Sequence, residues 1–340
     1  MTTDDSLQSD SRWPHRVAFV LACVTFPLIW VGGLVTTYDA GMAVPDWPGT
    51  YGYNLFLYPW QSWVAGPWDL FMEHGHRLLG ALAGMLTIGL VVTVYRFDHR
   101  GWLRWLSIVA LAAVILQGCL GGARVLLDAR QLAMIHGCAG PAFFALCVAL
   151  CVFTSRAWKN ASGDNPVPSA SRLHRSAIAM STMAYVQLVL GAQLRHVPTS
   201  ASPGFFELTV YGHLIFAGVV TLLVCTVAWM VFRGPTRHDA FRWPASTLLV
   251  LVVVQLLLGC ATWLVNYYWP SWTPDWDWVA AYTIIESKGL VQTMIVTAHQ
   301  ATGSLLLGVS VLLTLRAMRI VRGEPVASRS PAKALKGSAA

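Results

Sequence analysis

Residues 73–95 read EHGHRLLGALAGMLTIGLVVTVY, and this stretch decides the class of fold. After Arg77 it contains no charged side chain until Arg96, which lies just beyond its end. A helix rises 1.5 Å per residue, so about 20 such residues cross the roughly 30 Å hydrocarbon core of a bilayer. The stretch therefore predicts a transmembrane helix that carries the ionisable side chains of Glu73 and His76 near one end.

Seven further stretches have the same character and predict an all-α integral membrane protein with eight spans. Of the 340 residues, 56% are hydrophobic and 11% are charged, and the mean hydropathy is +0.55. These values exclude a soluble globular domain, a disordered chain and a disulfide scaffold. The first stretch is too long, and is followed by too many spans, to be a cleaved signal peptide. The predicted spans are residues 17–37, 73–95, 103–126, 132–153, 174–194, 208–232, 244–266 and 290–315.

The Lys and Arg residues predict the direction of these spans. Eighteen of the 23 lie before the first span, after the last, or between spans two and three, four and five, and six and seven. By the positive-inside rule these segments are cytoplasmic. We therefore expect an inner-membrane protein of a bacterium with both termini in the cytoplasm. Topology thus accounts for the net charge of +7, and no nucleic-acid partner is expected.

A polar linker divides the spans four and four. The predicted parts are a cytoplasmic tail at 1–16, a first half at 17–153, a cytoplasmic linker at 154–173, a second half at 174–316 and a cytoplasmic tail at 317–340. Two outer segments, 38–72 and 267–289, contain four Trp each. Because Trp favours the membrane interface, both segments are expected to pack on the membrane surface as caps.

Matching motifs predict that the halves are two tandem-repeated four-helix bundles. Gly75-His76 in span two corresponds to Gly212-His213 in span six. The other matches, in the same order along the chain, are Gly32-Gly33 with Gly191-Ala192, Gln117-x-x-x-Gly121 with Gln255-x-x-x-Gly259, and His136-x-x-x-Gly140 with His299-x-x-x-Gly303. Both halves would cross the membrane in the same direction, which makes this a parallel repeat.

One histidine in each even-numbered span forms the main group of candidate ligands. They are His76, His136, His213 and His299. All four lie in the outer half of the bilayer, and an ionisable residue inside a span is a functional candidate by default. One such His is as often a core residue bonded across helices, but four at one depth favour two bis-histidine haem sites. Gly140 and Gly303 would either let a flat macrocycle approach the backbone or pack helices together.

The sequence disfavours a copper or zinc site and gives no functional role to its cysteines or to a second group of histidines. Copper or zinc is disfavoured because no Cys-x-x-Cys motif occurs in a span and three of the four candidate histidines have no carboxylate near them in the sequence. The seven Cys lie in or at the ends of spans and are expected to be packing residues. A second group of histidines, in the cytoplasmic segments, is expected at the solvated surface. It comprises His15, His99, His174 and His238.

The two predicted sites differ at one position. Glu73 lies three residues before His76, on the same helical face, whereas the matching position before His213 is Val210. An acid beside only one site suggests proton transfer there, although the helix dipole also favours a carboxylate at a helix start. Arg77 is expected to bind a haem propionate or to anchor the helix at the interface. The other outer cations are Arg124, Arg130, Arg195 and Lys288.

Several of these motifs together resemble the haem A synthase family. They are GLVTTYDAGMAVPDWP at 33–48, Glu73-x-x-His76-Arg77, Gln117-x-x-x-Gly121-Gly122, His136, Gln187-x-x-x-Gly191-Ala192, His213 and His299-x-x-x-Gly303. The resemblance covers about residues 17–316. It departs from the family in the first outer loop, where many bacterial members carry a Cys pair and this chain has no Cys.

The resemblance implies a membrane oxidoreductase that oxidises a ring methyl of haem O to a formyl group, giving haem A for terminal oxidases. It implies that His76 and His136 hold the substrate haem, with Glu73 catalytic. It also implies that His213 and His299 ligate a haem b. The implied partners are haem O synthase as the source of substrate and the assembly of cytochrome oxidase as the destination of product. The sequence identifies no electron donor.

Two other functions compete with this one. A non-catalytic di-haem b-type cytochrome in quinol electron transfer would also need two bis-histidine sites. Such cytochromes usually place two His on one helix, at two depths, whereas this chain has one per helix. A transporter of haem or of another small molecule is the third possibility.

Overall fold

The computed structural model describes residues 11–160, 170–198, 200–234, 236, 239–267 and 289–323. In this part of the chain, eight helices are long and apolar enough to cross a membrane, so the predicted all-α, eight-span fold is confirmed. They are α2 (Trp13–Thr37), α4 (Trp68–Phe97), α5 (Gly101–Leu126), α6 (Arg130–Thr154), α8 (Ala170–Arg195), α9 (Pro203–Phe232), α10 (Asp239–Tyr267) and α12 (Leu290–Gly323). Two short helices accompany them, α3 (Trp60–Val64) and α7 (Arg156–Lys159).

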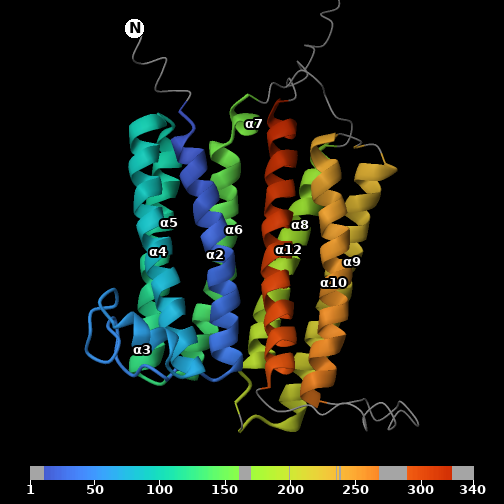
Figure 1. The fold of residues 1–340 in the computed structure, drawn as a ribbon. Coiled ribbons are helices and arrows are strands. Elements are labelled where there is room, and N and C mark those ends of the chain that lie inside the picture. The colour runs from blue at the N-terminus through green and yellow to red at the C-terminus, as the bar shows by residue number, and fades with distance from the viewer. Residues whose placement is uncertain are drawn as a thin grey trace, which may run out of the picture.

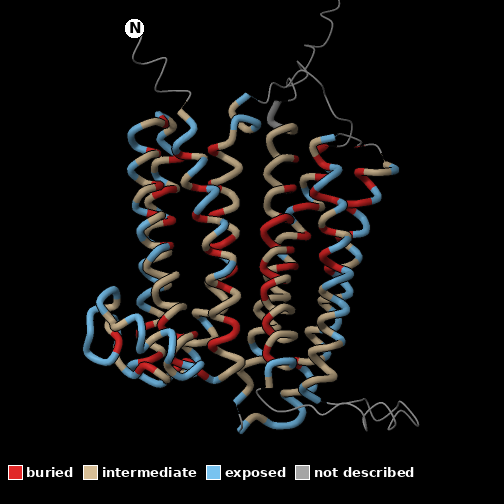
Figure 2. Tube along the Cα trace, viewed as in Figure 1, coloured by how far each residue is buried: buried red, intermediate tan, exposed pale blue. Residues whose placement is uncertain are grey.

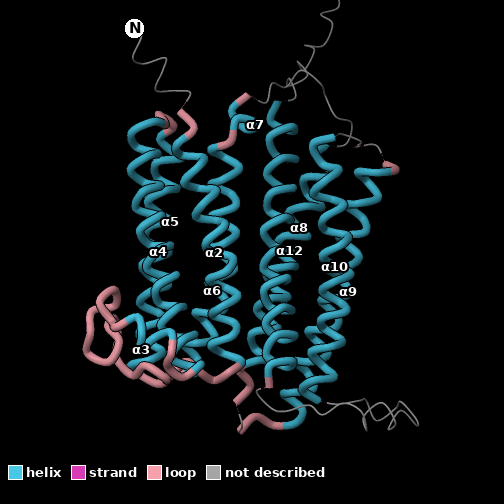
Figure 3. Tube along the Cα trace, in the orientation of Figure 1, coloured by secondary structure: helices cyan, strands magenta, loops and turns pink. Residues whose placement is uncertain are grey.

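The long helices stand side by side in two groups of four (Figure 1). One group contains α2, α4, α5 and α6, and the other contains α8, α9, α10 and α12. The groups meet where α12 packs against α2 and α6. Helix α2 begins and α12 ends on the same side of the molecule, which we call the terminal side. The opposite side carries residues 38–67, which we call the cap (Figure 3).

Several helices extend beyond the predicted spans. Helix α4 already begins at Trp68, and α9 begins at Pro203. In α9 the hydroxyl of Ser202 accepts the N–H of Phe205 at 3.3 Å, and Pro203 suits the first helical position. A hydropathy pattern detects only the part of a helix that lies in the hydrocarbon core. Capping of this kind lets the helix continue beyond that part. The predicted outer segment 267–289 lies almost wholly outside the described residues, as do most of both tails and residues 161–169 of the linker.

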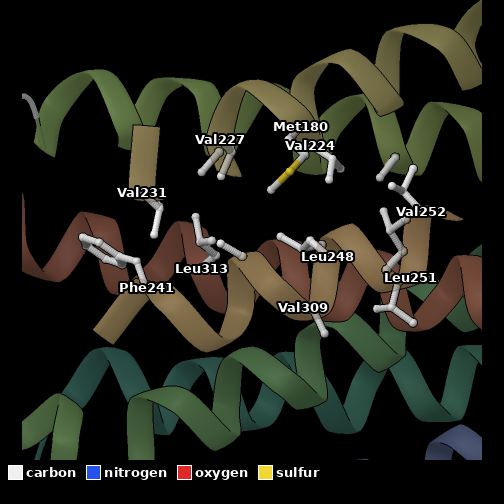
Figure 4. Close-up of a cluster of buried hydrophobic side chains, with 14 of the residues drawn as sticks. Met180, Val224, Val227, Val231, Phe241, Leu248, Leu251, Val252, Val309 and Leu313 are labelled. Carbon is white, nitrogen blue, oxygen red and sulfur yellow. The ribbon is translucent and has the colours of Figure 1, made fainter. Parts of the chain in front are cut away.

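Each group of helices has its own apolar core near the terminal side (Figure 2). In the first group, Leu21, Leu90 and Leu150 are fully buried. In the second, Met180, Val224, Phe241, Leu248 and Leu313 converge from four helices (Figure 4). Aliphatic side chains thus fill the terminal half of both groups, whereas the candidate histidines belong to the cap-side half.

Two of the histidines expected at the solvated surface are instead partly buried. The Nδ1 atom of His15 lies 3.1 Å from the carbonyl of Cys151, and that of His174 lies 3.3 Å from the carbonyl of Thr314. Each clamps the first helix of its group to the fourth. His15 and His174 lie 17 residues before Gly32 and Gly191. The two contacts are therefore at matching positions in the two groups of helices. His99 is exposed, as expected, and His238 is outside the described residues.

Candidate functional site: two histidine pairs

The structure brings the four candidate histidines together in two pairs. His76 on α4 faces His136 on α6, with ring centroids 6.3 Å apart. His213 on α9 faces His299 on α12, also with centroids 6.3 Å apart. The four residues lie between six and ten positions after the cap-side starts of their helices. At 1.5 Å per residue they all sit about 9–15 Å below those helix ends.

This separation fits two imidazoles bound to a single metal ion. An imidazole nitrogen lies about 2.0 Å from a first-row metal ion, and the ring centroid lies roughly 1.1 Å behind that nitrogen. Two imidazoles on opposite sides of one ion would therefore have centroids about 6.2 Å apart. The observed separation of 6.3 Å recurs in both pairs, although the interplanar angles differ, at 87° and 72°. Both pairs thus fit an iron porphyrin held by two histidines.

Each of the four imidazoles lies against a glycine of a neighbouring helix, which we call its contact glycine. A Cβ atom added at that glycine would be 2.8–3.2 Å from the histidine Cε1 atom. The pairs are Gly32 with His76, Gly121 with His136, Gly191 with His213, and Gly259 with His299. Since any side chain would displace the ring, these glycines fix where each imidazole stands. The four Nδ1 atoms are buried and lack a hydrogen-bond partner among the described residues, whereas Nε2 of His213 lies 3.3 Å from Nε2 of Gln187.

Glutamines occupy the turn before three of the contact glycines. The Nε2 atom of Gln117 donates to the carbonyl of His136 at 3.2 Å, and that of Gln187 donates to the carbonyl of His213 at 2.9 Å. Gly140 and Gly303, which were candidates for clearing a macrocycle, instead lie against the amides of Gln117 and Gln255. Of the two roles left open for these glycines, this contact favours helix packing.

Glu73 is buried beside the first pair, and both of its carboxylate oxygens are engaged. Oε2 accepts the backbone N–H of Val44 at 2.9 Å, and Oε1 forms an ion pair with Arg77 at 2.7 Å. Arg77 also donates to the carbonyls of Val44, Asp46 and Gly49 at 2.6–2.8 Å. Glu73 and Arg77 together therefore hold the cap onto α4. Sequence spacing placed Glu73 on the face of His76, but it gave no sign of this link to the cap.

Further contacts fasten the cap over the first pair. The hydroxyl of Thr50 lies 2.8 Å from Nδ1 of His74, which is fully enclosed. The indole of Trp47 lies directly on Gly122 of α5, next to the contact glycine Gly121. Asp46 closes a loop by accepting the N–H groups of Tyr51 and Gly52. Burial acts to raise the pKa of Asp46, but these hydrogen bonds and Arg77 outweigh it and lower the pKa.

A different cation bears directly on the first pair. Arg124, near the cap end of α5, interacts electrostatically with the imidazoles of His76 and His136 and with Glu73. Its guanidinium lies against Gly41 of the cap. Arg77 also interacts electrostatically with His76, but it directs its donors to the cap and to Glu73. Of the two, Arg124 is the better placed to receive an anionic group at the first pair.

His196 is a residue that the sequence analysis did not single out. It follows the last residue of α8, on the cap side, and no motif marks it. Burial, together with the charges of Arg195, Arg130 and Arg124, lowers the pKa of His196 from 6.5 to about 4. Its imidazole is therefore neutral at pH 7, and three arginines converge on it from both groups of helices.

This environment predicts a specific dependence of stability on pH. Between about pH 6.5 and pH 4 the unfolded chain binds a proton at His196 that the folded chain does not, so stability falls as pH drops. After allowance for partial exposure, the loss is about 1–2 kcal/mol. We expect His196→Gln to reduce the difference in Tm between pH 7 and pH 4.5 by a few degrees, measured by thermal unfolding in detergent. An identical pH dependence in the variant would contradict the assigned environment.

The fold and these sites define a class of protein, an eight-span membrane protein with two enclosed histidine pairs, one of them beside a buried carboxylate. Residues 67–202 match the COX15-CtaA family, described as cytochrome oxidase assembly protein. The predicted resemblance to haem A synthases is confirmed by three bacterial relatives, each named "Heme A synthase". The one from Symbiobacterium thermophilum is 28% identical over 262 residues, which cover 70% of this chain and 81% of that protein.

The other two relatives are similar at a comparable level. The protein from Shouchella clausii is 28% identical over 181 residues, covering 51% of this chain and 56% of its own length. The protein from Geobacillus kaustophilus is 26% identical over 250 residues, covering 67% of this chain and 75% of its own length. The likeness therefore spans both groups of helices.

Proposed function

We propose that this protein is a membrane oxidoreductase that acts as a haem A synthase, oxidising the ring methyl of haem O to the formyl group of haem A. One observation carries the proposal: two histidine pairs share the same geometry, yet only the first has a buried carboxylate beside it. Its similarity to haem A synthases over most of the chain supports the same conclusion. A non-catalytic di-haem cytochrome gives no reason for this difference and is not favoured.

In this proposal the first pair binds the substrate. His76 and His136 hold the iron of haem O, which supplies the redox chemistry when bound, while Gly32 and Gly121 set the positions of the imidazoles. Glu73 takes up a proton at a carboxylate oxygen as the methyl group is oxidised. Arg77 pairs with that carboxylate and contributes to haem binding through the cap that it anchors. The closed cap shields the reacting edge from bulk water.

The propionates of the substrate are proposed to meet Arg124 in preference to Arg77. Arg124 interacts with both imidazoles of the first pair, and guanidinium groups bind carboxylates by charge-assisted hydrogen bonds. The second pair, His213 and His299, is proposed to hold a resident haem b that is not converted. In that half Val210 occupies the position that matches Glu73, so no proton acceptor stands there.

The cellular setting follows from topology and from the proposed reaction. The protein is an integral multi-pass membrane protein. We place it in the inner membrane with the terminal side in the cytoplasm, because 18 of the 23 Lys and Arg residues are on that side. Haem O would arrive from haem O synthase within the bilayer, and haem A would pass to cytochrome oxidase during its assembly. Oxidation of the methyl to a formyl group adds one oxygen atom and removes four electrons from the haem, so the reaction also requires either dioxygen with an electron donor or water with an electron acceptor.

Genetic complementation tests the proposed function. The gene is expressed in a bacterium whose own haem A synthase gene has been deleted, and the membranes are analysed for the haem A absorption band of the terminal oxidase. We expect the band and oxidase activity to return. Membranes that contain the protein with haem bound, but no haem A, would contradict the proposal.

A further inference from the structure

Two successive glycines on α2 connect the two histidine pairs. Gly32 is the contact glycine of His76 in the first pair. Gly33 faces the other way, onto α12, where an added Cβ would be 2.9 Å from Cγ2 of Thr297 and 3.2 Å from Oε1 of Gln300. Thr297 and Gln300 flank His299, the ligand of the second pair, so an unbroken series of contacts joins the two pairs.

The side chain of Arg195 lies at the contact between Gly33 of α2 and Gln300 of α12. It extends from the end of α8 and donates to the carbonyl of Gly33 at 2.8 Å, to the hydroxyl of Thr37 and to the amide oxygen of Gln300. Thr37 in turn donates to the carbonyl of Gly33 at 2.9 Å. One guanidinium thus binds the turn of α2 beside the first pair and the turn of α12 beside the second. We call Gly33, Thr37, Arg195 and Gln300 the junction.

The acceptors of Arg195 are all neutral. Among the described residues no carboxylate forms an ion pair with it, in contrast to Arg77, which is paired with Glu73. A charge that is partly buried and not neutralised acts over a longer distance than one at the surface. An iron porphyrin with two neutral imidazoles is one unit more positive when oxidised than when reduced. Arg195 therefore disfavours the oxidised form of an iron held nearby.

We infer that the junction couples the two histidine pairs, with Arg195 as a positioning residue that raises the reduction potential of the second-pair iron and makes that potential respond to occupancy of the first pair. The inference rests on the proposed function in one respect, that both pairs hold iron porphyrins. Coupling of this kind is reciprocal, so the state of the second iron also changes the affinity of the first pair for its haem. Oxidation at one site would thereby be linked to substrate binding at the other.

Potentiometric titration of the purified holoprotein tests the junction. The potential of the second-pair haem is measured with the first pair loaded with haem O and, separately, in a His136→Ala background in which the first pair cannot form a bis-histidine complex. With Arg195 in place, we expect the potential of the second-pair haem to differ between these two states of the first pair. Arg195→Gln is expected to favour the oxidised form about tenfold, which lowers a one-electron potential by about 59 mV. It should also remove most of the difference between the two backgrounds.

Matched variants separate coupling from general damage. Arg195→Lys retains the charge and should restore more than half of the shift. Arg130→Gln removes a cap-side charge that donates to a single exposed carbonyl, that of Val197, and should leave the potential unchanged. Gly33→Ala should disturb the coupling, whereas Gly308→Ala should not. Gly308 has an equally close contact between the same two groups of helices, 2.8 Å to Phe144, but it lies away from the pairs.

The outcomes distinguish this inference from the proposed function. If Arg195→Gln leaves both potentials as they are in the unchanged protein, or if Gly308→Ala acts as strongly as Gly33→Ala, the junction does not couple the pairs. That result can occur in a protein that still makes haem A, which refutes the inference alone. A protein that shows the predicted shifts but makes no haem A refutes the proposed function alone.

Discussion

Replacement of Glu73 by glutamine is expected to lower the rate of haem O conversion by about 10²–10⁴-fold, the usual value of general acid–base assistance. The amide oxygen of the variant can still accept the N–H of Val44, so this bond to the cap is retained. It cannot take up a proton or balance the charge of Arg77. We expect kcat to fall while the KM for haem O changes little, measured by chromatography of haems in timed reactions.

A matched control exists in the other group of helices. Val210 precedes His213 as Glu73 precedes His76, and Val210→Ala should leave turnover nearly intact. Bis-histidine spectra of both sites should persist in Glu73→Gln, which separates lost chemistry from lost binding. A normal rate of haem A formation in that variant would show that Glu73 acts only as the anchor of the cap.

Removal of either histidine of the second pair has the other large expected effect. His213→Ala or His299→Ala should abolish the bis-imidazole spectrum of the resident haem, because the iron loses one of two axial ligands and no other described imidazole stands near it. Optical spectra of the purified, reduced proteins give the measurement.

The control for this pair is His174, a partly buried histidine of the same group of helices. It binds the carbonyl of Thr314, on the terminal side, and His174→Ala should retain the spectrum of the resident haem. A bis-imidazole spectrum that survives both His213→Ala and His299→Ala would show that these residues are not the ligands.

The spans and the candidate ligands could be predicted from sequence because both depend on local patterns. Twenty apolar residues specify a span by themselves, and His76, His136, His213 and His299 stand out as ionisable residues in apolar stretches. The repeat between the halves predicted a common depth. The pairing of His76 with His136 and of His213 with His299 was implied by the resemblance to haem A synthases.

Other features depend on contacts between distant parts of the chain and carried no local signal. The link from Glu73 to Val44 and the bonds from Arg195 to Gly33 and Gln300 join residues that no periodicity connects. The contact glycines Gly32 and Gly191 were noticed only as a repeated pair, and their role against an imidazole emerged from packing. Partial burial of His15 likewise depends on α6, which follows it by more than 100 residues.

Identification of the extracted haems tests the central claim most directly. The protein is purified from cells that co-express a source of haem O, its haems are extracted with acid and organic solvent, and they are separated by chromatography against standards. The account predicts haem A, formed at His76 and His136, together with haem B from His213 and His299. Haem B alone, from protein with both histidine pairs loaded, would contradict it and would identify the protein as a cytochrome without this catalytic activity.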